Sequence, residues 1–487
     1  ITLFYLYRAN HLHYQACYKL FSTSVLSHKS FLQLLDHSER RMNLYHYRSV
    51  ESARKEIECR TFRYADRNEL NDPLEGYAQI YWKGDCPAWE GLFRNYICSV
   101  YYAVVGIQLN ASEELLAERA VIPDIHCFDD VPLGQVWKEL SDRFVQTALV
   151  QKLIVDLGNT ETEMNAHRLR QILRLCHEDA IKICLDDMHK RKTLPGEQGG
   201  PVVSISEKAD WEKMGGFGNL ESPLIKMMKA AFEVYEETLE SSFLKLEQEI
   251  EANEPNARKR RLWLKVRLGF PALYIAGLQE LPYPRMFMMC FSTDGTNSAM
   301  WGNYAQNHCG VCLVYRANEE NGKQTLRVKT AESWSSSSGY SCGFRDDPVY
   351  PVRYTDEQVK RNFFESLGRL TFSQIESWMV SSKGERSRIL ELYDKDAWRV
   401  QYWKDQQEKY LTKLPAWSHE QEYRLLMNDS FHQHTEAERY VGYDPAILEG
   451  VIFGIKTSEA DKMQIFRTLR KSMEEAGRDP KELEVWQ

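Results

Sequence analysis

The sequence predicts an α+β protein in which a mixed or antiparallel core sheet carries a large inserted helical subdomain. Three observations predict this fold class. Short strand patterns lie between residues 44 and 64, a mostly helical pattern fills 89–278, and two almost wholly apolar segments follow at 285–291 and 309–315. Short continuous apolar segments of this kind are typical of strands that are buried on both faces.

Length and composition fit a division into a sheet part and a helical part. The chain has 487 residues, of which 43% are hydrophobic and 12% aromatic, which is enough for two or three domains with packed cores. We expect an extension that is non-native or disordered, a first part of the core, a helical insertion or lid, and the main part of the core, at 1–41, 42–88, 89–280 and 281–487.

Charge and cysteine content narrow the class of protein. The net charge of −8 argues against a chain dominated by nonspecific DNA binding, so a nucleic-acid partner is not indicated by charge. No apolar segment approaches the roughly 20 residues that a membrane helix needs, and we expect no membrane partner. The eleven cysteines have no regular spacing, which together with the lack of a secretory signature predicts reduced thiols in a cytoplasmic protein.

The first elements are predicted to be a strand, a helix and a second strand, at 44–47, 49–58 and 61–64. Ser49 suits the N-cap of that helix. Asn71, Asp72 and Pro73 then predict a turn that leads into a helix, because Asn and Asp cap helices and Pro suits the first helical position.

The later elements follow the same patterns. Helical periodicity is clear at 222–251 and is interrupted before it by a Gly/Pro-containing break at 194–201. A flexible polar loop is expected at 333–339 and a largely helical stretch at 356–411. Further strands are predicted at 348–354, 422–427, 439–443, 450–455 and 483–486, with a helix at 458–475.

An acidic pair stands in the predicted strand near the C-terminus. Tyr423, Leu425 and Met427 alternate onto one face of this strand, and extending it backwards places Glu420, Glu422 and Arg424 on the other. Neighbouring carboxylates raise each other's pKa and form a spot rich in hydrogen-bond acceptors. Such a spot serves chemistry, binds a cation or holds an arginine, and the sequence leaves all three interpretations open.

Several short segments, in order, resemble one bacterial family, which is catalogued as domain of unknown function 2971. The segments are Leu44-Tyr45-His46-Tyr47-Arg48-Ser49, Leu70-Asn71-Asp72-Pro73-Leu74-Glu75, Cys290-Phe291-Ser292, Met300-Trp301-Gly302-Asn303-Tyr304-Ala305, His308-Cys309-Gly310-Val311-Cys312-Leu313, Val352-Arg353-Tyr354, Glu420-Gln421-Glu422-Tyr423-Arg424 and Ile452-Phe453-Gly454-Ile455. The resemblance runs from about Met42 to the C-terminus. It implies no activity.

A second, remoter resemblance implies one. Arginine-class ADP-ribosyltransferases carry an Arg, a Ser-Thr-Ser and a Glu-x-Glu on successive strands, and this chain has Arg48, Ser292-Thr293 and Glu420-Gln421-Glu422 in that order. Asp294 stands where the middle motif has its second serine. His46 is also similar to the histidine of the histidine-class enzymes, and DarT-like toxins open with a comparable strand.

The resemblance to transferases implies NAD as the substrate and a macromolecule of unknown kind as the acceptor. Glu422 would stabilise the oxocarbenium-like transition state and Glu420 would activate the nucleophile. Arg48 would bind the pyrophosphate, and Ser292 would brace Glu422. The other members of the expected NAD site are His46, Thr293, Trp301 and Tyr304. A toxin or antiphage effector with a neutralising partner is the implied biological class.

Two further function classes stay open beside this one. A metal-dependent nuclease or hydrolase would use Asp72, Glu75, Glu420 and Glu422 to hold Mg²⁺. A non-catalytic binding or regulatory module would instead tie the acids to Arg424 or Lys413. We predict no metal, because the thiols of Cys309 and Cys312 have no second pair and fit buried packing.

Overall fold

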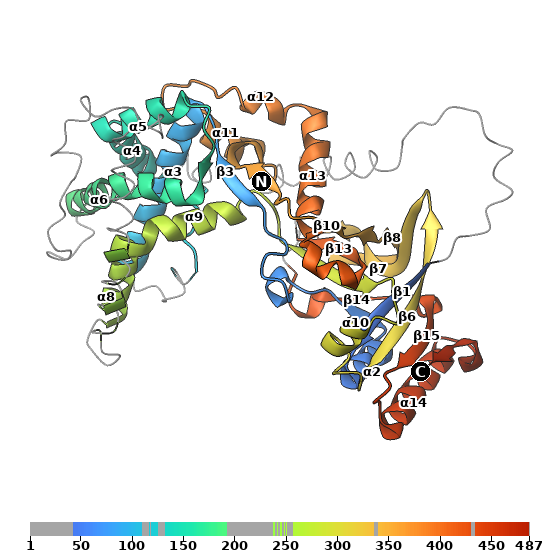
Figure 1. Ribbon diagram of the computed structural model, residues 1–487. Helices are drawn as coiled ribbons and strands as arrows, with labels where there is room; N and C mark the ends of the chain where they lie inside the picture. Colours follow the sequence, from blue (N-terminus) through green and yellow to red (C-terminus); the bar gives the residue numbers. More distant parts are fainter. Residues whose placement is uncertain are drawn as a thin grey trace, which may run out of the picture.

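The computed structural model describes residues 42–486 except 110–115, 117, 125–131, most of 192–256, 336–338 and 430–433. The expected extension at 1–41 and most of the predicted helix at 222–251 lie outside these residues. The described chain forms a β lobe and a helical lobe (Figure 1), so the α+β prediction is confirmed.

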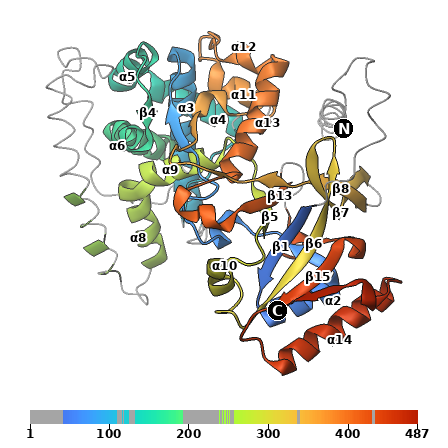
Figure 2. The same ribbon diagram turned by 45° about the vertical axis from the view of Figure 1, so that its right-hand side comes forward.

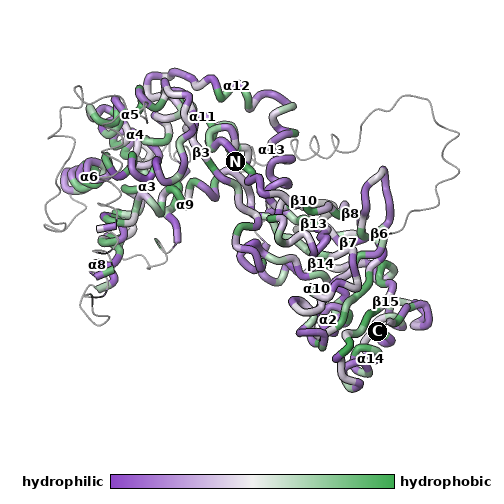
Figure 3. The backbone as a smooth tube through the Cα atoms, viewed as in Figure 1, coloured by the Kyte–Doolittle hydropathy of each residue, from purple (hydrophilic) through white to green (hydrophobic). Residues whose placement is uncertain are grey.

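The β lobe is built on one large, mainly antiparallel sheet. Its central strand β1 (Met42–Arg48) lies between β5 (Met286–Ser292) and β6 (Val311–Glu320). The sheet continues outward through β13 (Glu422–Asn428) and β9 (Tyr350–Pro351) on one side, and through β15 (Leu448–Phe453) and β16 (Glu484–Trp486) on the other. A long hairpin of β7 (Lys323–Ser335) and β8 (Gly339–Pro348) extends from β6. Hydrophobic residues run along the central strands (Figure 3).

The two faces of this sheet have different covers. The α2 face takes its name from helix α2 (Val50–Cys59), which packs on it together with α14 (Glu459–Glu475) and buries Leu44, Leu313 and Phe291. The α10 face carries α10 (Ser298–Asn303), whose Trp301 contacts the ring of Tyr47 at a centroid distance of 5.1 Å. The helices lie on opposite sides of the strands in Figure 2. Because side chains alternate along a strand, each strand residue belongs to one of these faces.

The helical lobe is assembled from two stretches of the sequence. The first comprises α3 (Cys86–Gln108), α4 (Pro132–Val145), α5 (Ala148–Gly158), α6 (Ala166–Lys190), α8 (Ala257–Leu264) and α9 (Phe270–Glu280). The second comprises α11 (Phe372–Met379) and α12 (Leu390–Tyr393), which bury their apolar residues in the same core. A Cβ on Gly91 of α3 would lie 2.2 Å from the Trp378 carbonyl oxygen, so these backbones touch. The domain division expected from the sequence assigned α11 and α12 to the main part of the core, at 281–487.

Smaller elements connect the lobes. Helix α13 (Asp396–Tyr410) returns the chain to the sheet. Three small sheets pair β2 (Thr61–Arg63) with β14 (Tyr440–Gly442), β10 (Arg353–Tyr354) with β12 (Thr412–Lys413), and β3 (Gln79–Trp82) with β4 (Met164–Asn165) and β11 (Lys360–Asn362).

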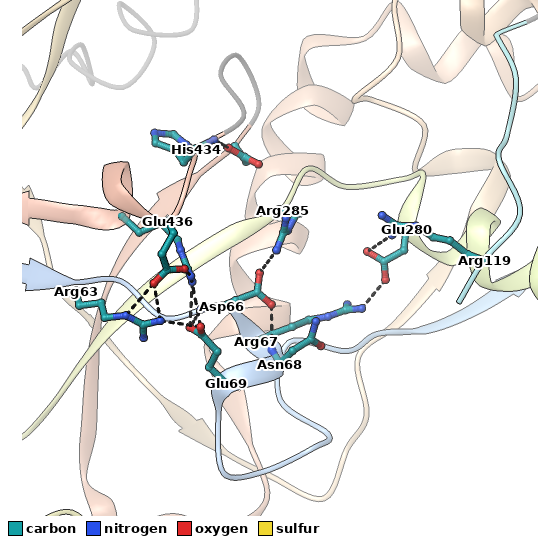
Figure 4. Close-up of polar contacts among 12 residues, drawn as sticks. Arg63, Asp66, Arg67, Asn68, Glu69, Arg119, Glu280, Arg285, His434 and Glu436 are labelled. Atoms are coloured by element: carbon teal, nitrogen blue, oxygen red, sulfur yellow. Dashed lines mark hydrogen bonds and ion pairs between the residues drawn. The ribbon is translucent and has the colours of Figure 1, made fainter. Parts of the chain in front are cut away.

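Figure 4 shows ion pairs between the lobes, where Arg67 and Arg119 both reach Glu280 of α9. Asp66, the residue before Arg67, pairs with Arg285.

Two local predictions were wrong. Of the expected loop at 333–339, residues 333–335 belong to β7 and Gly339 to β8, and the remaining residues lie outside the described part of the chain. The turn at Asn71–Asp72–Pro73 does not continue into a helix but leads to β3, because Oδ1 of Asp72 accepts the Leu74 N–H at 2.9 Å within the turn. None of the described helices combines the length and hydropathy needed to cross a membrane.

Candidate functional site

A buried ionic cluster surrounds the acidic pair. It consists of Glu75, Lys413, Glu420, Glu422 and Arg424, each at most 7% exposed. Arg424 donates from Nε and Nη2 to the two oxygens of Glu422, at 2.8 and 2.7 Å. Its Nη1 donates to the Tyr410 carbonyl at 2.7 Å, and Nη2 also bonds Glu75. The arginine therefore joins β13, the end of α13 and the turn before β3.

Lys413 completes the cluster. Its Nζ lies 2.5 Å from Glu420, 3.2 Å from Glu75 and 3.4 Å from Glu422. Burial alone raises the pKa of Glu422, but Arg424 and Lys413 outweigh it and hold that pKa at about 2. Burial raises the pKa of Glu75 more than the two cations lower it. One carboxylate is thus held ionised, while the other resists ionisation.

Glu420 reaches this cluster by a different route from the one predicted. It ends a 3₁₀ helix, Pro415–Glu420, and Gln421 then adopts a left-handed conformation with φ 44° before β13 begins. Oη of Tyr304 donates to Glu420 at 2.6 Å, and Nδ2 of Asn71 donates to that hydroxyl at 2.9 Å. The expected shared strand face is therefore corrected, although Glu420 and Glu422 do meet through Lys413.

His46 and Arg48 lie on the other face of the sheet. Tyr45 pairs with Ser292, and Ser292 pairs with Glu422, so these three share the α10 face. His46 and Arg48 lie one and three residues after Tyr45 along β1, so both side chains are on the other face of the sheet, the α2 face. Nδ1 of His46 and Nε of Arg48 contact buried Glu56 of α2, at 2.9 and 3.2 Å. Burial lowers the pKa of His46.

The expected middle motif has local partners. The Asp294 N–H donates to Oγ of Ser292 at 3.1 Å, and Oη of Tyr47 donates to the Asp294 carbonyl at 2.6 Å. Oγ1 of Thr293 donates to the Gln421 carbonyl at 3.3 Å. These bonds fix the segment that follows β5. The structure therefore brings Ser292, Glu420 and Glu422 to one face and leaves Arg48 behind the sheet.

The carboxylates are not arranged for a metal ion. Within the part of the chain that the structure describes, no group of three or more His, Cys, Asp or Glu side chains could hold one. Lys413 and Arg424 occupy the space between Glu75, Glu420 and Glu422. Cations that already neutralise the acids leave no acceptor-only cage of the kind Mg²⁺ requires.

Our sequence analysis missed a pocket on the α10 face, which we call the aromatic pocket. Its volume is about 540 Å³. It is lined by Asn43, Tyr45, Gly295, Thr296, Ser298, Trp301, His308, Ile452, Phe453, Gly454, Ile455 and Trp486. The His308 ring stacks on Trp301 at a centroid distance of 6.4 Å and an angle of 12°. None of the lining residues is Asp, Glu, Lys or Arg, so the pocket favours a ligand part without charge.

A turn of left-handed residues places His308 in the lining of the aromatic pocket. Gln306, Asn307 and His308 have φ values of 50°, 53° and 69°, and each non-glycine residue in this region costs about 1–2 kcal/mol. The turn is held where the His308 N–H donates to the Trp301 carbonyl at 3.1 Å and the Gly310 N–H to the Ala305 carbonyl at 2.8 Å. Strain that is kept in place by its surroundings is common at binding sites.

The fold and these sites define an α+β protein whose antiparallel sheet carries a buried ionic cluster and an aromatic pocket on one face. Residues 300–425 match the family described as "Protein of unknown function (DUF2971)". The resemblance stated from the sequence is confirmed there. No curated protein and no solved structure matches the chain.

Proposed function

We propose that this protein is a binding module that holds a small molecule by a flat, uncharged ring, such as a nucleobase, in the aromatic pocket. The observation that carries the proposal is the lining of that pocket: Tyr45, Trp301, His308 and Trp486 supply rings, and no acid or permanent cation is present. Flat rings stack on aromatic side chains, and pockets of roughly 300–1,000 Å³ bind ligands of this size.

NAD is the first ligand to test, through its adenine ring. The residues whose order suggested an NAD-consuming transferase include Ser292 and Glu422, which share the face that carries the pocket. ADP-ribosyl transfer to a macromolecule, in a cytoplasmic toxin or antiphage effector, stays a prediction. It requires Glu422 to leave two hydrogen bonds from Arg424, and it requires another group in place of Arg48 for the pyrophosphate.

We assign the ionic cluster a structural role in this proposal. Its salt bridges tie β13 to Lys413 of β12 and to the turn at Glu75. Tyr304 then connects α10 to Glu420, one helical turn beyond Trp301 of the aromatic pocket. The cluster fixes the helix that forms the pocket wall, and preorganised walls reduce the entropy lost on binding.

A pair of tryptophan substitutions in α10 tests the pocket. Ser298 lines it and is exposed, whereas the neighbouring Ala299 is exposed but does not line it. Isothermal titration of NAD, adenosine and nicotinamide should show binding of at least one ring to the wild type. Ser298→Trp fills the pocket and should weaken that binding at least about tenfold, the effect of losing one good stacking contact. Ala299→Trp should bind as the wild type does.

Two outcomes contradict the proposal. One is that the wild type binds none of these ring compounds at millimolar concentration. The other is that Ser298→Trp and Ala299→Trp weaken binding equally, which would place the ligand elsewhere. Chromatographic measurement of released nicotinamide separates binding from chemistry: NAD bound without release supports a binding module, whereas release that Glu422→Gln abolishes in a folded variant supports the transferase.

A further inference from the structure

A second pocket, of about 680 Å³, lies in the β lobe, and we call it the basic pocket. It is lined by Cys59, Arg60, Thr61, Lys329, Phe344, Tyr440, Gly442, Tyr443, Asp444, Pro445, Ala446, Ala476 and Arg478. These residues come from the end of α2, the β2–β14 pair, the β7–β8 hairpin and the segment after α14. The basic pocket shares no residue with the aromatic pocket or the ionic cluster.

Hydrogen bonds to neutral oxygens, most of them main-chain carbonyls, hold its two arginines in place. Nη1 of Arg478 donates to the carbonyls of Pro445 and Leu448, the latter at 3.1 Å. Arg60 donates from Nε to Oγ of Ser472 at 3.1 Å and from Nη2 to the Ser472 carbonyl at 3.0 Å. Contacts with neutral carbonyls orient a guanidinium without cancelling its charge.

Each arginine keeps one amino group for a ligand. The only acids that these guanidinium groups contact among the described residues are Glu475, 2.8 Å from Nη2 of Arg60, and Glu482, 3.4 Å from Nε of Arg478. Both glutamates are more than half exposed, and exposed pairs of this kind are weak in water. A guanidinium has five N–H donors. The contacts named above use Nε and Nη2 of Arg60 and Nε and Nη1 of Arg478, and they leave Nη1 of Arg60 and Nη2 of Arg478 for a ligand.

The remaining charges favour an anion. Lys329 is an exposed residue of β7 that lines the pocket. Asp444 is the one acid in the lining, and Arg327 pairs with it at 3.1 Å while its other oxygen accepts the Ala446 N–H at 2.9 Å. The lining residues thus comprise three cations and one carboxylate that is already paired, and the two glutamates that contact the arginines lie outside the lining. The lining is therefore basic in a chain whose net charge is −8. Local charge of this kind concentrates anions.

We propose that the basic pocket binds the phosphate group of a small anionic molecule. Two fixed guanidinium groups and one flexible ammonium match the several oxygens of a phosphate, because the arginine forks bind such oxygens in a defined geometry. Phe344 and Tyr440, which are 43% and 48% exposed, supply apolar surface for the organic part of the same ligand. The inference is independent of the ring-binding proposal.

Lys329 permits a test that leaves the fold intact, because it is exposed and lies on the hairpin. Lys323 is an exposed lysine of the same strand outside the pocket and serves as the matched control. Inorganic pyrophosphate is titrated into the full-length protein and followed by ³¹P NMR line broadening. Lys329→Gln should weaken binding about threefold to fivefold, the effect expected from one exposed charge, while Lys323→Gln should bind as the wild type does.

Salt dependence gives a second readout. Binding at the basic pocket should weaken as sodium chloride rises from 50 to 200 mM, because salt shortens the Debye length and screens the attraction between the pocket and the anion. The proposal is overturned if the wild type does not broaden the pyrophosphate signal at millimolar concentration. It is also overturned if both lysine variants weaken binding to the same extent, since that pattern means diffuse attraction to the hairpin.

Discussion

Glu422→Gln is the substitution that separates a structural acid from a catalytic one. The glutamine has nearly the same shape but removes the negative charge that faces Arg424. Arg424 is fully buried, so water does not replace the lost partner. A catalytic glutamate at an open site would lose activity while the melting temperature stayed nearly unchanged, as the transferase resemblance predicts. The ionic cluster predicts the opposite, a folded-state defect.

The magnitude follows from two separate routes. Breaking a buried ion pair by removing one partner costs about 3–5 kcal/mol. The depressed pKa of Glu422, about 2 against an ordinary value of 4.5, corresponds to about 3 kcal/mol at neutral pH, since one pKa unit is worth 1.36 kcal/mol. For a domain of 150–250 residues, 1 kcal/mol shifts the melting temperature by about 2–4 °C, so the expected drop is roughly 6–20 °C.

The sign of the pH dependence adds an internal check. Because the pKa of Glu422 is lower in the folded state, its contribution to stability is present above pH 4.5 and is lost as the pH falls from 4.5 to about 2. The wild type should therefore lose stability in that window. Glu422→Gln, which has already lost the charge, should show a flatter acid limb.

Differential scanning calorimetry measures the effect. Glu449→Gln is the matched control: Glu449 pairs with Arg316 in the same sheet at 2.6 Å, but both side chains are 25–30% exposed. That control should cost at most about 1 kcal/mol. A Glu422→Gln protein whose melting temperature lies within 2 °C of the wild type, or equals that of the control, would refute the structural reading of the cluster.

Two further predictions use the same instrument. Glu75→Gln should destabilise less than Glu422→Gln, because burial raises the pKa of Glu75, whereas Arg424 and Lys413 lower the pKa of Glu422. Equal losses would contradict this difference between the two acids around Arg424. Gly310→Ala should cost about 3 kcal/mol or more, since its Cβ would lie 2.2 Å from the Arg48 carbonyl oxygen. The control is Gly302→Ala, whose Cβ meets nothing within 4 Å and which should be neutral or slightly stabilising. Equal effects of the two substitutions would contradict the close approach of Gly310 to the Arg48 carbonyl of β1.

Much of the fold could be predicted because its signals are local. The apolar segment at 285–291 became β5. The alternation at Tyr423, Leu425 and Met427 put Leu425 in the core on the α2 face, with the other two partly buried against it. The joint helical lobe could not be predicted, because α11 meets α3 through a backbone contact between residues far apart in the sequence, Gly91 and Trp378. Hydrophobic periodicity shows which face of a helix is buried and not what covers it.

The site was harder to predict for a different reason. The aromatic pocket depends on three successive left-handed residues that include Gln306, and no composition signal marks a glutamine for that conformation. His308 and Tyr45 stood in the segments that resemble the family, but their rings meet one pocket only because the turn folds back on Trp301. Glu420 was expected on a strand, whereas the left-handed Gln421 ends a 3₁₀ helix just before β13.

The case for a transferase depends on strand register more than on residue identity. Arg48, Ser292 and Glu422 occur in the right order along the chain, and each lies on or at the end of a predicted strand. Order does not fix which face a side chain occupies; pairing does. Since Tyr45 lies opposite Ser292 and Ser292 opposite Glu422, Arg48 is on the α2 face with Glu56. A one-residue slip of β1 would reverse this placement, but it would also move Leu44 out of the core and Tyr47 away from Trp301. The same hydrophobic packing that stabilises the sheet therefore keeps the arginine apart from the acids.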